Sequence, residues 1–178
     1  RVDVTTLQAV SGAGYSGVTS MEIIDNAIPH IGGEAPKMET ESRKLLGEFD
    51  GAALSLHETT VNASCNRIPT LDGHLESLFV DLADDPTPEE ARQAMREYPG
   101  VDLPSAPDQL IHVFGEDEMY RPQPRMDRGR EDGMQISAGG VESTDSGIKY
   151  NCLAHNTIRG AAGASLLNGE LLVEEGWI

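Results

Sequence analysis

The sequence predicts an α+β fold in which a mostly antiparallel, mixed sheet carries helices on one face. Segments with the composition of strands outnumber the segments with helical spacing, and the helical segments are short. The predicted strands follow one another at uneven intervals along the chain, which favours an α+β domain. With 178 residues, the chain is long enough for one domain with its own core.

Three elements open the chain. β-Branched residues predict a strand over residues 4–10, which enters a glycine-rich turn at Gly12. Apolar residues at helical spacing predict a helix over residues 20–31. Residues 39–46 predict a second helix, which ends at Gly47.

Most of the predicted strands lie in the middle and the second half of the chain. Residues 145–147 predict the turn of a hairpin. The strand candidates are residues 53–64, 74–82, 110–114, 134–141 and 148–153, of which the last two form that hairpin.

Two further helices and one loop complete the expected elements. Thr87 and Pro88 are typical of a helix start, because a threonine hydroxyl caps free amides and proline suits the first helical position. This helix is expected to end near Tyr98. Small residues predict a closely packed helix over residues 156–172. Residues 120–132 hold prolines, arginines and acids, which predict a surface loop.

Net charge is the strongest signal in the composition. Thirteen basic residues face 30 acidic residues, which gives a formal charge of −17. Nucleic acid and anionic membranes need a basic surface, so neither is expected as a partner. The acids are spread along the chain, which favours a folded protein with a carboxylate-rich surface over a disordered acidic tail and suggests the cytoplasm of a halophile.

Other features of the sequence further limit the possible class of protein. No stretch approaches about 18 uninterrupted apolar residues, so no membrane span is expected. The chain starts at Arg1 without an apolar leader, which suggests a cytoplasmic fragment of a longer protein. Cys65 and Cys152 are expected to be reduced and buried. The five histidines show no metal-ligand spacing, so no metal is expected.

The segment from Gly12 to Gly17 fits the G-x-G-x-x-G pattern between a predicted strand and a predicted helix. Such a loop binds a dinucleotide when a parallel strand and an acidic ribose ligand follow the helix. Here a second helix follows instead. The pattern therefore favours a tight turn beside a ligand over a dinucleotide-binding domain.

Five polar residues are candidates for binding or chemistry. Arg67 offers a planar fork suited to a carboxylate, and His74 can move protons near neutral pH. The two bracket a turn, so both can face one cleft. Glu41 and Lys44 share a helix face, and Gln8 can hydrogen-bond a carbonyl. On the residues alone, a surface arginine with a turn histidine, an exposed ion pair and a solvent-facing glutamine stay open as alternatives.

Four segments, in order along the chain, resemble the archaeal and fungal-type aspartate-semialdehyde dehydrogenases. Residues 6–15, T-L-Q-A-V-S-G-A-G-Y, resemble the strand and loop that open the catalytic domain of that family. Residues 41–46 look like its E-x-x-K-[IL]-L helix. Residues 65–74, C-N-R-I-P-T-L-D-G-H, are similar to its C-x-R-V-P…D-G-H strand and turn. Residues 156–165 resemble its closing helix.

The resemblance implies a two-domain enzyme with an α+β domain like the C-terminal domain of glyceraldehyde-3-phosphate dehydrogenase. Residues 1–155 would form the catalytic and dimerisation domain. Residues 156–178 would form a helix that packs back on an N-terminal Rossmann domain, which holds NADP. The enzyme would be a homodimer that interconverts aspartyl phosphate and aspartate semialdehyde, on the route to lysine, threonine and methionine.

The resemblance also implies roles for the five polar candidates. His74 matches the acid/base, and Arg67 matches the arginine that clamps the substrate α-carboxylate. Glu41 matches the acid near the substrate amino group, and Lys44 matches the phosphate-binding lysine. Gln8 matches the glutamine of the reacting pocket.

Three residues match the cofactor side of the family's site, and one family residue is absent. Ser11 and Gly12 match the loop that approaches the cofactor, and Asn156 matches an asparagine on the nicotinamide side. The nucleophilic cysteine of the family lies upstream, in an S-N-C segment. Cys65 and Cys152 match other positions, so the chain is expected to be inactive alone.

Two other functions are compatible with the sequence. A related acyl reductase, such as a malonyl-coenzyme A reductase, would share Arg67 and His74 but would have less need of Lys44 as a phosphate anchor. A non-catalytic module would serve only to dimerise. The enzyme interpretation requires Gln8, Arg67 and His74 to converge on one cleft.

Overall fold

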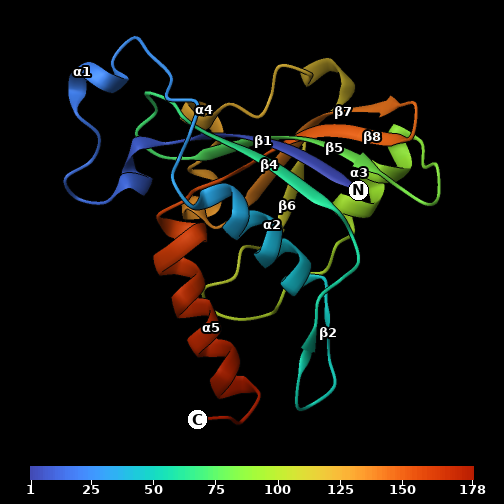
Figure 1. Ribbon diagram of the computed structural model, residues 1–178. Helices are drawn as coiled ribbons and strands as arrows, with labels where there is room; N and C mark the ends of the chain where they lie inside the picture. Colours follow the sequence, from blue (N-terminus) through green and yellow to red (C-terminus); the bar gives the residue numbers. More distant parts are fainter.

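The computed structural model describes residues 1–178 and contains one six-stranded mixed sheet and one two-stranded hairpin (Figure 1). The strands are β1 (Val2–Gln8), β2 (Glu48–Phe49), β3 (Leu54–Ser55), β4 (Val61–Arg67), β5 (His74–Asp81), β6 (Ile111–Val113), β7 (Ile136–Thr144) and β8 (Gly147–Ala154). The order across the large sheet is β4-β1-β5-β8-β7-β6. The outer pairs, β4–β1 and β7–β6, are parallel, and the three inner pairs are antiparallel. The predicted α+β class and mostly antiparallel mixed sheet are confirmed.

Five α-helices and four short turns connect the strands. The helix predicted from Thr87 is confirmed, because the Thr87 hydroxyl accepts from the Glu90 amide while the Glu90 carboxylate accepts from the Thr87 amide. The α-helices are α1 (Ser20–Ile23), α2 (Glu34–Leu45), α3 (Pro88–Arg96), α4 (Pro124–Asp127) and α5 (Gly163–Glu174). The 3₁₀ turns span Val10–Ala13, Glu116–Glu118 and Arg130–Gly133, and a π-helical turn at Ile158–Ala162 leads into α5.

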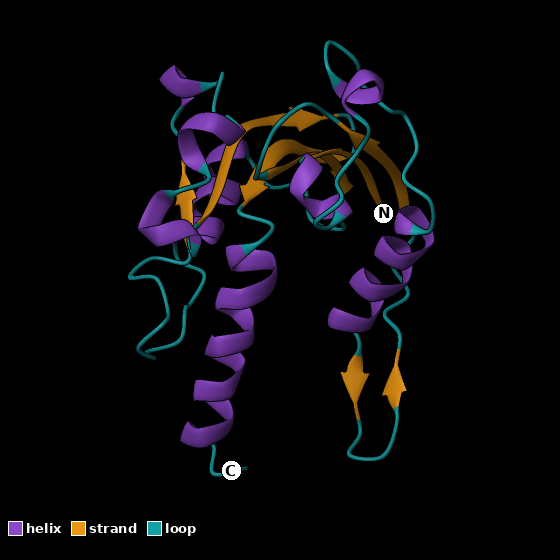
Figure 2. Ribbon diagram, turned by 90° about the vertical axis from the view of Figure 1, so that its left-hand side faces the viewer, coloured by secondary structure: helices purple, strands orange, loops and turns teal.

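The longer helices lie on one face of the sheet. Val4 of β1 and Leu78 of β5 are register partners, and both line a cleft beneath α2. On the same face, Ile148 of β8 packs with Ala91 of α3. Figure 2 shows the sheet as an arch with α2 and α5 beneath it.

Part of the opposite face of the sheet is left bare. Thr5, Ser64 and Phe79 alternate with the residues that face the helices, and all three are exposed. Phe79 is 50 % exposed and lies opposite Lys149 in the register of β5 and β8. This face therefore presents a flat, mixed surface to solvent.

Three predicted elements are wrong in part. Of the predicted helix 20–31, only Ser20–Ile23 is α-helical, because Ile28 exchanges both backbone hydrogen bonds with Arg67, at 2.8 and 2.9 Å. The predicted strand 53–64 is split into β3 and the start of β4. The predicted loop 120–132 contains α4, whose Asp127 is 1 % exposed and paired with Arg121.

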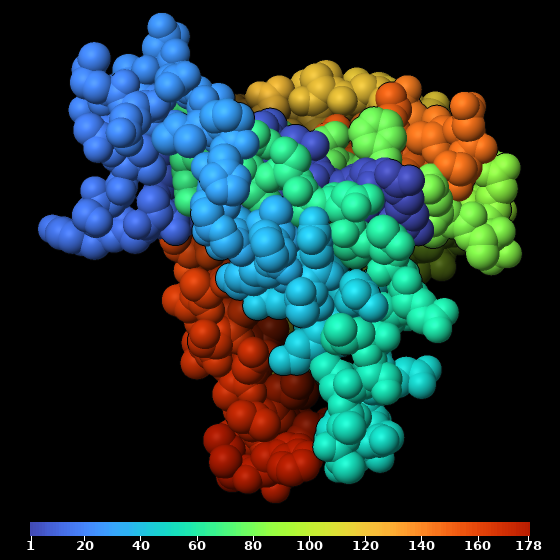
Figure 3. Space-filling model, viewed as in Figure 1, coloured from blue at the N-terminus to red at the C-terminus, as the bar shows by residue number.

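α5 and the β2–β3 hairpin project from the same end of the molecule (Figure 3). Apolar side chains on and beside both elements are exposed. Trp177 is 77 % exposed and Phe49 is 68 % exposed. Only 27 of the 178 residues are buried, so this chain leaves more apolar surface uncovered than a self-contained domain of its length does. None of the helices has the length and apolar content needed to cross a membrane.

Candidate functional site

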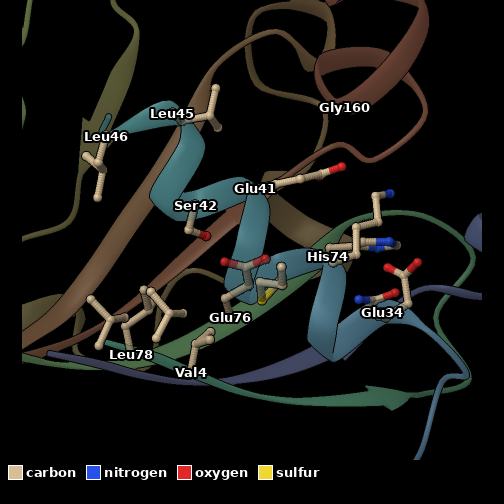
Figure 4. Close-up of a pocket in the computed structure, with 15 residues that line it drawn as sticks. Val4, Glu34, Glu41, Ser42, Leu45, Leu46, His74, Glu76, Leu78 and Gly160 are labelled. Carbon is tan, nitrogen blue, oxygen red and sulfur yellow. The ribbon is translucent and has the colours of Figure 1, made fainter. Parts of the chain in front are cut away.

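The ends of three neighbouring strands bring Gln8, Arg67 and His74 to the same edge of the sheet. Gln8 ends β1 and is the register partner of Arg67, which ends β4. His74 begins β5, which runs antiparallel beside β1. Gln8 and His74 line a cleft of about 690 Å³ between the sheet and α2 (Figure 4).

Gly12 marks the point where the arginine and the histidine meet. A Cβ atom added at Gly12 would lie 2.9 Å from Nη1 of Arg67 and 3.2 Å from Nε2 of His74. Both side chains therefore border one spot, close enough to contact a single small molecule. Gln8 and His74 thus share one cleft, and Arg67 meets His74 beside Gly12 without lining that cleft.

His74 is held by the backbone of the loop that follows β1. The amide of Ala9 donates a hydrogen bond to Nδ1 of His74 at 3.1 Å. Burial and, secondly, the neighbouring guanidinium of Arg67 lower the pKa of His74 to about 4, although the carboxylates of Glu34 and Asp72 oppose this shift. At neutral pH the imidazole is therefore uncharged.

Arg67 is 6 % exposed and is fixed from two sides. Its Nη1 donates to the carbonyl of Ala9 at 2.6 Å, and its backbone pairs with Ile28 at the sheet edge. Burial lowers the pKa of Arg67, and the charge of Glu34 raises it. A guanidinium stays protonated through such a shift, so the site holds a fixed cation.

The helix α2 supplies the charges on the opposite wall of the cleft. Glu34, Lys37 and Glu41 line the cleft, whereas Lys44 does not. Glu34 lies nearest the reacting end, since its charge acts on both His74 and Arg67. In Figure 4, Glu41 extends toward Gly160.

The Glu41–Lys44 pair chosen from the sequence is therefore only half in the cleft. Glu34 and Lys37 have the same E-x-x-K spacing about two helical turns earlier, and sequence reasoning missed them. The predicted helix began at residue 39, so it left both residues outside the helix. The repeated spacing was the signal that could have found them.

The turn before His74 is tied to three other segments. The Gly73 amide donates to Oδ1 of Asn156 at 2.8 Å, and Nδ2 of Asn156 donates to the Ser11 hydroxyl at 2.8 Å. Nη1 of Arg128 donates to the carbonyl of Asp72 at 2.9 Å. Asn156 and Ser11 thus form one rim of the site, and Arg128 is a support that sequence reasoning missed.

The deeper part of the cleft is largely apolar and holds one carboxyl group. Glu76 lies on its floor, and burial raises the pKa of this carboxyl. The thiol of Cys152 lies 3.8 Å from it. Burial raises the pKa of both Cys65 and Cys152, so neither thiol resembles an activated nucleophile.

The arrangement is suited to a small molecule with several charges. A lysine and carboxylates line the cleft with an uncharged imidazole, and the buried guanidinium of Arg67 lies beside that imidazole. Such a set can orient a substrate that carries both an ammonium and anionic groups, and the imidazole can hydrogen-bond a reacting oxygen. No three side chains of His, Cys, Asp or Glu are grouped so that they could hold a metal ion.

Comparison with known proteins matches residues 1–159 to the family described as semialdehyde dehydrogenase, dimerisation domain. The aspartate-semialdehyde dehydrogenase of Archaeoglobus fulgidus is 46 % identical over 175 residues, which cover 98 % of this chain and 50 % of that protein. The enzyme of the same name from Schizosaccharomyces pombe is 44 % identical over 186 residues, which cover 99 % of this chain and 52 % of that protein.

A solved structure gives the same result. Aspartate-semialdehyde dehydrogenase from Candida albicans, determined with NADP, superimposes with a TM-score of 0.87 at 39 % identity. The match covers 99 % of this chain and 51 % of the other. The chain therefore spans about half the length of the relatives that it matches.

Proposed function

The chain belongs to the family of semialdehyde dehydrogenase dimerisation domains, and from this premise we propose that it is the catalytic and dimerisation half of an NADP-dependent aspartate-semialdehyde dehydrogenase. The reaction converts L-aspartate 4-semialdehyde, phosphate and NADP to 4-aspartyl phosphate and NADPH, on the route to lysine, threonine and methionine. The observation that carries the proposal is the meeting of Arg67 and His74 beside Gly12.

Each charged group of the substrate has a partner of opposite charge in the cleft or, for Arg67, beside His74 at its edge. Arg67 is the partner of the α-carboxylate, because a buried guanidinium fork binds a carboxylate through two parallel hydrogen bonds. Lys37, in place of Lys44, is the partner of the phosphate, because it alone of the two lysines faces the cleft. Glu34 and Glu41 face the substrate ammonium, and Gln8 faces the reacting carbonyl.

The rim formed by Ser11, Gly12 and Asn156 fits the nicotinamide end of NADP. Gly12 has no side chain at the one point where a Cβ would press on Arg67 and His74, so a flat ring can approach the reacting carbon there. Asn156 holds the rim by its bonds to Gly73 and Ser11. When bound, NADP supplies the acceptor for the hydride.

The remaining parts of the enzyme come from outside this chain. A cysteine of the NADP-binding half supplies the nucleophilic thiol, because the pKa values of both Cys65 and Cys152 are raised by desolvation, which disfavours the reactive thiolate. The apolar side chains of residues 156–178 pack back on that half, which explains their exposure here. Residues 1–155 hold the substrate and the dimer contact.

The bare face of the sheet is the surface on which a second copy docks. Thr5, Ser64 and Phe79 present a flat, exposed patch that no long helix covers. A symmetric dimer buries the same patch on both copies. The family description as a dimerisation domain supports this assignment.

The function is tested by joining the chain to its NADP-binding half and assaying two substrates. We expect NADP-dependent oxidation of aspartate semialdehyde in the presence of phosphate, and little reduction of malonyl-coenzyme A, because Lys37 is placed for a phosphate. The opposite preference would favour the acyl-reductase alternative. No activity on either substrate would favour the dimerisation module.

A further inference from the structure

We propose that the cavity between α5 and the loop of residues 97–110 binds a small monocarboxylate with an apolar body, and that Arg159 holds the carboxylate of this ligand. The cavity has a volume of about 250 Å³ and shares no lining residue with the cleft under α2. The loop connects α3 to β6 and runs beside α5, where Figure 1 shows it in yellow-green. The proposal concerns a second site and does not depend on the proposed function.

The lining of this cavity is largely apolar and comes from two segments. The loop supplies apolar side chains that include Tyr98, Val101 and Leu103. The helix α5 supplies Leu167 and Leu171, which lie one turn apart on the same helix face. Leu167 is 9 % exposed, whereas Tyr98 is 60 % exposed. The lining therefore runs from the interior of the chain to its surface, so a ligand can enter and bury its apolar part.

Arg159 is the one charged residue that lines the cavity, and its charge has no partner in this chain. Nη1 of Arg159 is buried without a hydrogen-bond partner, and none of the 30 acidic residues forms an ion pair with this arginine. Every other arginine that is not exposed donates to an oxygen of the chain. A buried charged donor without an acceptor is costly, so this guanidinium points to an anionic ligand.

The carboxylate of Glu170, on α5, fixes the loop instead of pairing with the arginine. The amide and the hydroxyl of Ser105 donate to its two oxygens at 2.9 and 2.6 Å. The amide of Asp108 donates to the carboxylate of Glu131 at 2.6 Å. The loop is therefore tied to α5 and to the turn before β7, so the walls of the cavity are held in place without using the guanidinium.

The class of ligand follows from the groups that line the cavity. An arginine fork binds a carboxylate through two parallel hydrogen bonds, and the apolar walls suit an aliphatic or aromatic body. No carboxylate lines the cavity, so the ammonium of an amino acid has no partner there. The volume lies below the roughly 300 Å³ at which pockets for drug-sized ligands begin, which limits the ligand to a small molecule.

A carboxylate side chain of the NADP-binding half is the alternative partner of Arg159. Successive residues of a helix are rotated by about 100°, so Val173 projects from a different side of α5 than Leu167 and Leu171 do. Val173 is 61 % exposed, and attachment of the other half through that side leaves the cavity open. The experiment therefore uses this chain both alone and joined to its NADP-binding half.

Binding is measured by NMR titration of the ¹⁵N-labelled protein with 3-phenylpropionate. Its amide lacks the charge, phenylalanine adds an ammonium, and inorganic phosphate lacks the apolar body. We expect 3-phenylpropionate to shift the Nε–H signal of Arg159 and the amide signals of residues 97–110 until they saturate. The amide should bind about 30-fold or more weakly, because it leaves the guanidinium unpaired. Phenylalanine and phosphate should also bind more weakly than 3-phenylpropionate.

Two kinds of variant test the assignment of the residues. Arg159→Leu should weaken the binding of 3-phenylpropionate by about 30-fold or more, and Arg159→Lys should recover part of that loss. Arg125→Gln, which changes an exposed arginine of α4, should leave the affinity unaltered. Leu171→Trp fills the cavity from a position that is 38 % exposed, so it should weaken binding even if Arg159→Leu fails to fold.

Four outcomes would overturn the proposal. Equal affinity for the acid and its amide would show an apolar crevice without an anion site, and equal affinity for phosphate would show an anion site without an apolar pocket. A response of Arg67 in place of Arg159 would put the ligand in the cleft under α2. Loss of binding when the NADP-binding half is joined would show that this half fills the cavity or pairs with Arg159.

Discussion

At the reacting end of the cleft under α2, Gln8 is 4 % exposed and Nδ1 of His74 accepts a hydrogen bond from the Ala9 amide, which leaves the histidine ring little freedom. At the far end of the same cleft, Leu45 and Leu46 are 84 % and 57 % exposed, so most of their apolar surface is left uncovered by this chain. The first region is assembled by contacts within this chain, from segments far apart in its sequence. The second is an apolar surface of the kind that another part of a protein covers.

This contrast separates the part of the chain proposed to recognise a substrate from the part proposed to attach to other components. Gln8, Arg67 and His74 are already in place, because β1 and β4 end where β5 begins. The apolar surfaces serve to attach other components. Variants at the reacting end should therefore change activity with little change in assembly, and variants at the far end should do the reverse.

The largest effect on activity is expected for Arg67→Leu. Losing a buried charged partner of the substrate should lower kcat/KM by about 100- to 1,000-fold, since truncation of such pairs costs several kcal/mol. Arg67→Lys keeps the charge but loses the fork, so it should recover only part of the loss. Steady-state kinetics with aspartate semialdehyde measure both. An unchanged KM in the leucine variant would show that Arg67 does not bind the substrate.

Gly12→Ala is expected to have the next largest effect. The added Cβ would lie 2.9 Å from Arg67 and 3.2 Å from His74, so both side chains must shift. We expect a loss of about 10- to 100-fold in kcat/KM, because small displacements of reacting groups are costly. Gly32→Ala is the matched control, since a Cβ there meets no atom within 4 Å. Equal effects of the two variants would show that activity does not depend on the free space beside Gly12.

Arg128→Gln is expected to act through the turn before His74. Loss of the bond to the Asp72 carbonyl should lower kcat by about 5- to 20-fold while KM changes little, because the turn loosens without losing a substrate contact. Arg128→Lys should recover part of the activity. The exposed neighbour Arg125, changed to Gln, serves as the control. A loss confined to KM would place Arg128 against the substrate instead.

The low pKa of His74 should make the free energy of unfolding of this chain depend on pH. The pKa is about 4 in the folded protein and 6.5 ordinarily, so between these values the unfolded chain binds more protons. Stability should therefore fall as the pH is lowered through this window. Urea unfolding at several pH values should show a weaker dependence of the free energy of unfolding on pH in the His74→Gln variant than in the parent. The same pH dependence in both proteins would contradict the burial of His74.

The smallest expected signal comes from the far end of the molecule. Trp177 is the only tryptophan of the chain and is 77 % exposed. If residues 156–178 pack on the NADP-binding half, a 5-fluorotryptophan label in this chain should shift its ¹⁹F resonance and lose its solvent accessibility when that half is added. Kinetics of Trp177→Ser should change little by comparison. An unaltered resonance would place the attachment surface elsewhere.

Elements that are set by contacts between residues close in sequence could be predicted from the sequence. The Thr87 cap sets the start of α3 by contacts within four residues, and the turn near Ser146 joins β7 to β8. The helix expected over residues 20–31 is wrong beyond Ile23 for a tertiary reason, because Ile28 pairs with the edge of β4. Helical spacing cannot report a partner 39 positions away.

The same limit applies to the site. Arg67 and His74 belong to one continuous segment, so the sequence predicted their meeting. The helix α2 begins at Glu34, five residues before the predicted start, so the sequence did not show that Lys37 also lines the cleft. The contacts of Arg128 with Asp72 and of Asn156 with Gly73 join distant segments, and only the fold reveals them.

The most direct test is a structure of the intact enzyme with aspartate semialdehyde bound. We expect the substrate carboxylate within hydrogen-bond distance of the Arg67 guanidinium, and the aldehyde oxygen within hydrogen-bond distance of Nε2 of His74. A molecule bound by Lys44, or one that touches only one of Arg67 and His74, would contradict the assignment of this site.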